Sequence, residues 1–303
     1  MNGSRREFLQ AACAGLGVTL LDRNLSPEDL ENTFKEIRKY LLEMINEERD
    51  VEKVQLVEMD DLATEVATKH AVDLASKEFI GHWGSDGLKP YHRYAAAGGT
   101  HATEENVSAA DGTWSNKAKD LKQDSAYLHV RMYQEKPPND GHRRTILAPQ
   151  HTHVGIGLAV QGLRLRLVEL FVAKYVDVKP IKREAKSGTQ LYFSGKIVRP
   201  GYLFNQLEVF YEPLPTPPEL EWLRQPRSYA LPKDSKVLRP RVQPPFVYPD
   251  GNVGTVEVYA DRSFQSPIRL YKDKPGIYTI VVWLRTAKSR VAFPATAVCI
   301  KGI

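Results

Sequence analysis

The spacing of apolar residues changes once along the chain, and this change most constrains its fold. Up to about residue 135, apolar side chains recur every three or four positions, the period of one buried helix face. From Val154 onward they alternate or form short blocks bounded by turn residues, which is typical of strands. A chain of 303 residues is long enough for two domains. We therefore expect a domain containing helices, followed by a domain of strands.

The first helix has a clear start. Ser26 is expected as its N-cap, Pro27 takes the first helical position, and Asp29 provides an acid three residues after the cap. The pattern predicts further helices over 61–76 and 116–135, and two strands over 153–160 and 163–176, joined by a turn at Gln161-Gly162. Helices followed by a hairpin predict an α+β unit, with an α/β/α arrangement of layers.

Residues 179–188 are polar and are expected to link the first domain, 26–178, to a second domain, 189–303. Beyond the linker, helical spacing nearly vanishes and proline-rich loops separate short strand-like segments. These segments are 189–198, 206–214, 254–264, 277–286 and 291–300. Several short strands with turn signals predict an all-β sandwich of immunoglobulin-like architecture, without the paired cysteines of antibody domains.

The N-terminus has the order of a signal segment, assigned to residues 1–25. The stretch SRREFL at 4–9 resembles a twin-arginine signal, and the apolar run at 11–21 is too short for a permanent transmembrane helix. An amphipathic N-terminal helix is the alternative, and no clean cleavage site follows. The remaining chain has no membrane-spanning run. We expect export to the periplasm, the cell envelope or the extracellular space.

The charge balance is mildly basic, with a formal net charge of +5 and a pI of about 9.0. Lysines and arginines are scattered among acids, so the balance fits loose attraction to anionic envelope polymers as well as to nucleic acid. Nucleic acid is not expected as a partner, because no basic stripe with interleaved aromatic residues occurs.

Four polar stretches of the first domain contain candidate functional residues. They contribute two histidines and two glutamates, namely His82, Glu105, Glu135 and His142. Such groups can share protons or offer nitrogen and oxygen ligands to a divalent cation. Their positions span about 60 residues, so spacing alone does not bring them together.

The order of several motifs identifies a family. The chain resembles the CAP superfamily of cysteine-rich secretory proteins, insect venom antigen 5 and plant pathogenesis-related proteins, and is most similar to the bacterial branch without cysteines. The resemblance runs from about residue 30 to residue 176. The matching residues are Leu42, Asn46 and Arg49; His82-Trp83-Gly84-Ser85-Asp86-Gly87 with Pro90, Arg93 and Ala97-Gly98; Glu105-Asn106-Val107; Gly141-His142-Arg143 with Ile146-Leu147; and Val154-Gly155-Ile156-Gly157.

The resemblance implies an α/β/α sandwich whose cleft contains His82, Glu105, Glu135 and His142. Three departures from the family pattern occur. Glu104 replaces a glycine, which is expected to change the turn that presents Glu105. Glu135 follows Met132-Tyr133-Gln134, where animal and plant members have W-Y-x-E and many bacterial members have serine in place of the glutamate. Thr145 replaces an asparagine.

Three functions remain open at this stage. The first is a non-catalytic binding or scaffolding protein of the envelope, whose cleft holds a lipid, a glycan or a divalent cation such as zinc or calcium. The second is a metal-assisted hydrolase of peptides or cell wall, with His82 and His142 as metal ligands and a glutamate as base. The third is a structural or adhesive protein acting through its sandwich. The absence of G-x-S-x-G and H-E-x-x-H motifs favours binding over catalysis, and the four cleft residues could also form a purely structural network.

Overall fold

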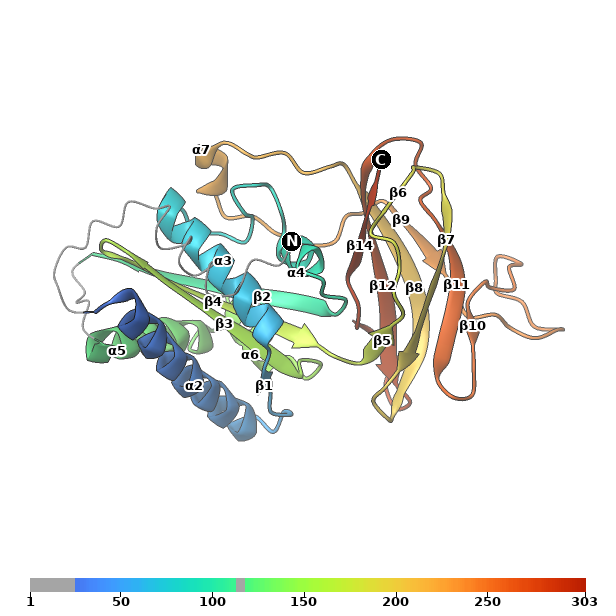
Figure 1. Ribbon diagram of the computed structural model, residues 1–303. Coiled ribbons are helices and arrows are strands. Elements are labelled where there is room, and N and C mark those ends of the chain that lie inside the picture. Colours follow the sequence, from blue (N-terminus) through green and yellow to red (C-terminus); the bar gives the residue numbers. More distant parts are fainter. Residues whose placement is uncertain (1–24, 113–117) are drawn as a thin grey trace.

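The computed structural model describes residues 25–112 and 118–303, which form an N-terminal α/β unit and a C-terminal sheet-rich unit (Figure 1). Residues 1–24 of the expected signal segment lie outside the described residues. Within the described ranges, no helix has both the length and the apolar character needed to cross a membrane.

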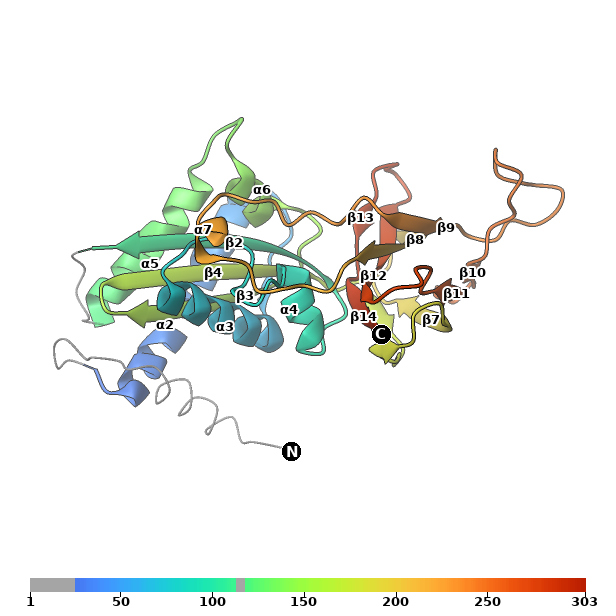
Figure 2. The same cartoon turned by 90° about the horizontal axis from the view of Figure 1, so that it is seen from above.

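The N-terminal unit has three layers. Its central sheet has the strand order β1-β3-β4-β2, with antiparallel pairing of β4 to both neighbours and parallel pairing of β1 to β3. Helices cover both faces of this sheet, as Figures 1 and 2 show. The strands are β1 (Glu58–Met59), β2 (Ala102–Asp111), β3 (His153–Gln161) and β4 (Arg164–Ala173). One face is covered by α2 (Pro27–Val51), α5 (Ala118–Tyr133) and α6 (Gly141–Leu147), and the other by α3 (Asp61–Lys77) and α4 (Pro90–Ala96). The predicted α/β/α fold is confirmed.

Local sequence explains how these layers form. Ser26 and Asp29 form the expected capping box at the start of α2. On β3, glycines allow α3 to lie directly against the strand, because a Cβ at Gly155 or Gly157 would come within 2.1 Å of α3 backbone carbons. This close approach is the structural reason for the V-G-I-G run at 154–157.

The prediction that Glu104 alters a turn is wrong. Glu104 and Glu105 lie inside β2, where they pair with Phe171 and Leu170 of β4. The strand was not expected. In its sequence ATEENVSAAD, the residues that point to one face of the sheet and those that point to the other both include polar side chains, so no apolar–polar alternation is visible. One set faces the core beside α3, and the other contributes to a buried polar network described below.

The C-terminal unit is mainly β-sheet, as predicted, and its two sheets enclose a core that includes Phe193, Phe264 and Tyr278. The first sheet has the order β10-β11-β7-β5, and the second β6-β14-β12-β8-β9, with β13 paired to β12. The bounds are β5 (Val176–Val178), β6 (Glu184–Ala185), β7 (Gln190–Ile197), β8 (Tyr202–Glu212), β9 (Ser235–Leu238), β10 (Glu257–Val258), β11 (Ser263–Arg269), β12 (Gly276–Thr286), β13 (Phe293–Pro294) and β14 (Val298–Gly302).

Three predicted segments differ in detail. The segment 254–264 contains two strands, β10 and β11, because the chain turns at Arg262, which has a φ of 69°. The segment 291–300 is split between β13 and β14, and two of the residues between them, Ala295 and Ala297, also form backbone hydrogen bonds with the N-terminal unit. The segment 179–188, expected as a linker, includes β6, which pairs with β14.

A long connection leaves the sandwich between β8 and β9. Residues 213–234, called the strap from here on, run over the N-terminal unit to the short helix α7 (Leu220–Leu223) and back, as Figure 2 shows. Leu223 is only 4% exposed and belongs to the core cluster between α3 and the sheet. The strap therefore joins the two units.

Candidate functional site

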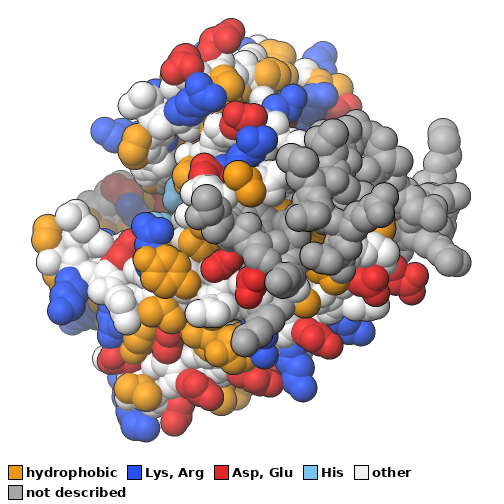
Figure 3. Space-filling view, turned by 90° about the vertical axis from the view of Figure 1, so that its left-hand side faces the viewer, with side chains coloured by type: hydrophobic (Ala, Val, Ile, Leu, Met, Phe, Trp, Pro, Cys, Tyr) orange, Lys and Arg blue, Asp and Glu red, His pale blue; other side chains and the backbone are white. Residues whose placement is uncertain are grey.

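The four residues singled out in the sequence line one cavity of about 420 Å³. They come from the α3–α4 loop, β2, the α5–α6 loop and α6, so the central sheet and segments on both of its faces contribute. The full lining is His82, Glu105, Asn106, Glu135, Asn139, Gly141, His142, Thr145 and Tyr229. The N-terminal side of the molecule, seen in Figure 3, carries basic and acidic side chains interspersed with one another.

The first half of the site is a buried carboxylate held by cationic and imidazole groups. Glu105 is 2% exposed. Its Oε1 lies 3.1 Å from Nδ1 of His82, and its Oε2 accepts a hydrogen bond of 2.6 Å from Nη2 of Arg93. Burial alone would raise the pKa of Glu105, but the charges of Arg93 and His70 and the hydrogen bond to His82 outweigh it and lower the pKa to about 2. Glu105 is therefore ionised and a weak base.

Arg93 also fixes the loop that carries His82. Its Nη1 donates hydrogen bonds of 2.8 Å to the carbonyl oxygens of His82 and Leu88. Arg93 thus binds the carboxylate of Glu105 and also the backbone of His82, the residue that Glu105 orients. This is the role of the arginine in the H-W-G-S-D-G…P…R motif.

The second half of the site is a histidine–glutamate pair nearer to solvent. Oε1 of Glu135 lies 2.5 Å from Nδ1 of His142, and Oε2 accepts a hydrogen bond of 3.0 Å from the backbone N–H of His142. The side chains of His142 and Glu135 are 33% and 25% exposed. One carboxylate therefore fixes both the first turn of α6 and the imidazole orientation.

The two histidines share one arrangement. In each, Nδ1 faces a carboxylate, and the side-chain hydrogen bond within the described ranges is made by Nδ1 and not by Nε2. When Nδ1 carries the proton, Nε2 offers a lone pair, the arrangement of metal-binding histidines oriented by a carboxylate. The described residues contain no group of three or more His, Cys, Asp or Glu side chains that could hold a metal ion. A metal held by His82 and His142 would therefore need its other ligands from water or from a bound molecule.

A buried polar network supports the second pair from behind, and the sequence did not reveal it. Asn106 donates from Nδ2 to the carbonyl of His142 (3.1 Å) and to Glu169 (3.4 Å). Glu169 lies 2.6 Å from Nδ1 of His129, whose Nε2 lies 2.9 Å from Glu48. Burial alone would lower the pKa of His129, but the two glutamates outweigh it and raise the pKa to about 10. An imidazolium therefore ties α2, α5 and β4 to the cleft.

Arg49 of the L…N…R motif positions the chain after His142. Its side chain is fully buried and donates to four backbone carbonyls, which replace the water that the charge has lost. Burial lowers the pKa of Arg49 to about 10, so it remains a cation at neutral pH. The acceptors are the carbonyl oxygens of Gln55, Ile146, Ala148 and His151.

One lining residue comes from the C-terminal unit. The hydroxyl of Tyr229, in the strap, accepts a hydrogen bond of 2.9 Å from the backbone N–H of Glu105 and donates one of 3.3 Å to its carbonyl. The centre of its ring lies 4.6 Å from that of His82, with the planes at 55°. Tyr229 was not predicted, because the strap has neither a periodic pattern nor a motif.

The other histidines do not line the cavity. His70 is buried, binds the carbonyl of Gly81 at 2.9 Å, and has its pKa lowered to about 4 by burial and by Arg93. His151 is also buried, and burial together with Arg49 lowers its pKa to about 3. His153 begins β3, as expected of a residue at the strand start. These histidines pack or support the fold around the cleft.

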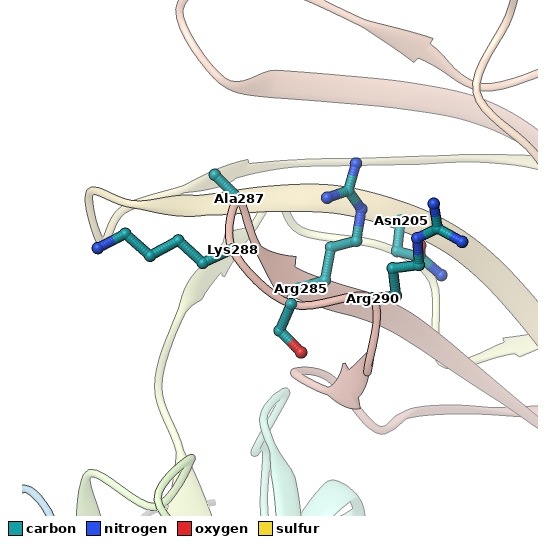
Figure 4. A pocket seen from close by; sticks show the side chains of 6 residues that line it. Asn205, Arg285, Ala287, Lys288 and Arg290 are labelled. Carbon is teal, nitrogen blue, oxygen red and sulfur yellow. The ribbon is translucent and has the colours of Figure 1, made fainter.

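A second depression, of about 410 Å³, lies on the β12–β13 connection of the sandwich and contains none of the predicted residues (Figure 4). Its basic side chains are Arg285, Lys288 and Arg290. Lys288 points away from the two arginines in Figure 4, so the three cations do not converge. The cleft between His82 and His142 is therefore the candidate functional site.

The N-terminal unit has a central sheet between two layers of helices, and its cleft contains two histidines, each paired with a glutamate. Residues 42–175 match the model of the cysteine-rich secretory protein family, CAP. The N-terminal unit is a CAP domain.

Solved structures to which this chain is similar include an outer surface protein from Borrelia burgdorferi and an extracellular SCP-domain protein from Bacillus anthracis. The first is 21% identical, with a TM-score of 0.36, and the match covers 46% of this chain and 92% of that one. The second is 18% identical, with a TM-score of 0.38, and the match covers 50% of this chain and 45% of that one. A comparison with curated protein sequences gave no match.

Proposed function

We propose that this is an exported, non-catalytic binding protein of the cell envelope, which binds a polar ligand or a divalent cation through His82 and His142. The observation that carries the proposal is the shared arrangement of the two histidines. A carboxylate orients each of them at Nδ1, and both line one cavity with Nε2 left for a ligand. Export is inferred from the SRREFL stretch and the short apolar run that follows it.

The state of Glu105 favours binding over catalysis. A general base works best when its pKa lies near the operating pH, and a pKa of about 2 makes Glu105 a poor proton acceptor. The hydroxyl of Thr145 already donates to the carbonyl of Gly141, so it is not activated as a nucleophile. The polar side chains of the cleft are held in place by hydrogen bonds to neighbouring residues, which is typical of a preorganised binding site.

A metal-assisted hydrolase is the second candidate, and Glu135 is the observation in its favour. This carboxylate lines the cavity beside His142 and is partly exposed, so it is the available general base for a water on a cation held by the two histidines. Its two oxygens already accept hydrogen bonds from the same residue, which is why we place this candidate second.

The test compares the wild-type chain with a His82→Ala, His142→Ala double variant. Zn²⁺ and Ca²⁺ binding is measured by titration calorimetry, and peptidoglycan binding by co-sedimentation. His153→Ala is the matched control, because this histidine lies outside the cavity at the start of β3. We expect the double variant to lose binding in at least one assay and His153→Ala to retain it.

Equal behaviour of wild type and double variant in every assay would refute the proposal. Release of soluble fragments from peptidoglycan by the wild type, and not by the double variant, would establish the hydrolase instead.

A further inference from the structure

The strap docks along the loop that carries His82. Near its start, the carbonyl oxygen of Thr216 lies so close to Gly87 that a Cβ there would be 2.4 Å away. Further on, Leu223 enters the core of the CAP domain, and Trp222 packs edge-on against Trp83 with ring centres 5.2 Å apart. The contacts therefore follow the H-W-G-S-D-G motif from one end to the other.

The strap then returns across the motif to the cleft. Nε1 of Trp83 donates a hydrogen bond of 3.1 Å to the carbonyl of Ser228. The next residue is Tyr229, which contacts both His82 and Glu105. The indole of the motif thus fixes the backbone immediately before the tyrosine, and this contact sets where the phenol ring lies.

The first end of the strap is also tied to the CAP domain. Glu212, the last residue of β8, accepts hydrogen bonds of 2.6 Å from Nζ of Lys89 and 3.0 Å from the hydroxyl of Tyr91. Lys89 is 6% exposed and Tyr91 is 4% exposed. A buried ion pair has a defined geometry, because separating the charges leaves one of them without a partner. The strap therefore begins from a fixed point on the CAP domain.

The position of β2 explains what the hydroxyl of Tyr229 does. β2 is the edge strand of its sheet, with β4 as its neighbour on one side only. At Glu105, the backbone N–H and C=O bond to the hydroxyl of Tyr229, which serves as acceptor for the first and donor to the second. The phenol therefore takes the place of a neighbouring strand at the one residue of β2 whose side chain orients His82.

We propose that the cleft is a joint site of both domains, in which Tyr229 is a positioning residue for Glu105 and His82 and forms the aromatic wall of the ligand pocket. The C-terminal domain then completes the site, in addition to any contact it makes elsewhere. The part of this inference that concerns ligand affinity rests on the proposed function of the cleft, whereas the positioning of His82 does not.

The experiment uses the full chain with Tyr229→Phe, which removes only the hydroxyl, and Tyr229→Ala, which also removes the wall. The matched controls are Tyr192→Phe and Tyr192→Ala, because Tyr192 is 71% exposed on β7 and does not line the cleft. Two quantities are measured, namely the ring-proton resonances of His82 by NMR without ligand and the dissociation constant for Zn²⁺.

We expect Tyr229→Ala to shift the His82 ring resonances, because the tyrosine ring 4.6 Å away is removed. We expect both Tyr229 variants to weaken Zn²⁺ binding, by about 10-fold, the effect typical of residues that orient metal ligands. The Tyr192 variants should change neither quantity. The Phe variant keeps the ring and its packing, so it separates loss of positioning from loss of folding.

Unchanged His82 resonances in Tyr229→Ala would overturn the inference, whether or not the chain binds zinc. Unchanged zinc affinity in both Tyr229 variants, against a wild type that binds zinc, would also overturn it. A wild type that binds neither Zn²⁺ nor Ca²⁺ nor peptidoglycan would refute the proposed function instead, and the His82 resonances would still decide whether Tyr229 lies against that ring in solution.

Discussion

Replacing Gly87 by alanine should detach the strap, and Gly188→Ala is a matched control. Both glycines have nearly the same left-handed backbone conformation, with φ of 80° and 81°. They differ in what an added Cβ would meet. At Gly87 it would lie 2.4 Å from the carbonyl oxygen of Thr216 in the strap, whereas at Gly188 nothing lies within 4 Å.

The magnitude follows from this difference. Alanine at a left-handed position costs about 1–2 kcal/mol, and both variants carry this cost. Only Gly87→Ala also pushes the strap, which must retreat by about 1 Å to restore an ordinary contact with the carbonyl of Thr216. The contacts at risk are the burial of Leu223, about 2 kcal/mol, and the hydrogen bonds of Tyr229, about 1 kcal/mol each. We expect Gly87→Ala to lower the free energy of strap detachment by about 1.5–3 kcal/mol more than the control does.

Limited trypsin digestion measures this detachment, because Arg224 and Arg227 lie in the strap and are exposed. Cleavage that requires local opening follows the population of the open form, and each 1.4 kcal/mol changes that population about tenfold. The rate of cleavage after these arginines, followed by mass spectrometry, should be about 10–100-fold higher in Gly87→Ala than in Gly188→Ala. Equal cleavage rates in the two variants would show that the strap does not bind the Gly87 turn in solution.

Three further predictions concern the core of the CAP domain. Arg93→Met should destabilise the protein by about 3–5 kcal/mol in urea unfolding, because it leaves the buried charge of Glu105 without its main partner; a loss below about 1 kcal/mol would contradict this. The raised pKa of His129, about 10 against an ordinary 6.5, adds stability that is complete below pH 6.5 and is lost as the pH rises through 10. Stability measured from pH 6.5 to 10 should therefore fall more steeply in the wild type than in His129→Gln, and parallel curves would refute the assignment. Gly157→Ala should cost about 3 kcal/mol or more by thermal unfolding, because its Cβ would meet the backbone of α3, whereas Gly141→Ala, with no atom within 4 Å of the added Cβ, should be nearly neutral.

Sequence alone predicted the elements whose signals are local. The capping box at Ser26, the helical period of α3 and the turn at Gln161-Gly162 each depend on residues a few positions apart. The family resemblance that the motifs carry implied one cleft containing His82, Glu105, Glu135 and His142, and all four residues line one cavity in the structure. The fold class and the order of the two units could be read in the same way.

The remaining features depend on contacts between distant parts of the chain. Tyr229 lies 124 residues after Glu105, in a segment rich in proline and without any period, so nothing local marks it as part of the cleft. His129 occupies an inward position of α5, where a helical pattern predicts packing and gives no sign of the two glutamates around it. β2 escaped notice because a strand that is polar on both faces has no alternation to detect.

The edge of β2 bears on whether the CAP domain can be produced without the C-terminal domain. At the first residues of β2, the sandwich covers this edge. The backbone N–H of Ala102 donates to the carbonyl of Ala295, and the backbone N–H of Ala297 donates to the carbonyl of Thr100. Farther along, the strap occupies the same edge. An isolated CAP domain ending near residue 178 would expose these backbone groups, and an open strand edge recruits strands from other molecules. The C-terminal domain covers this edge, and removing it would leave the backbone groups of β2 open to pairing with another chain.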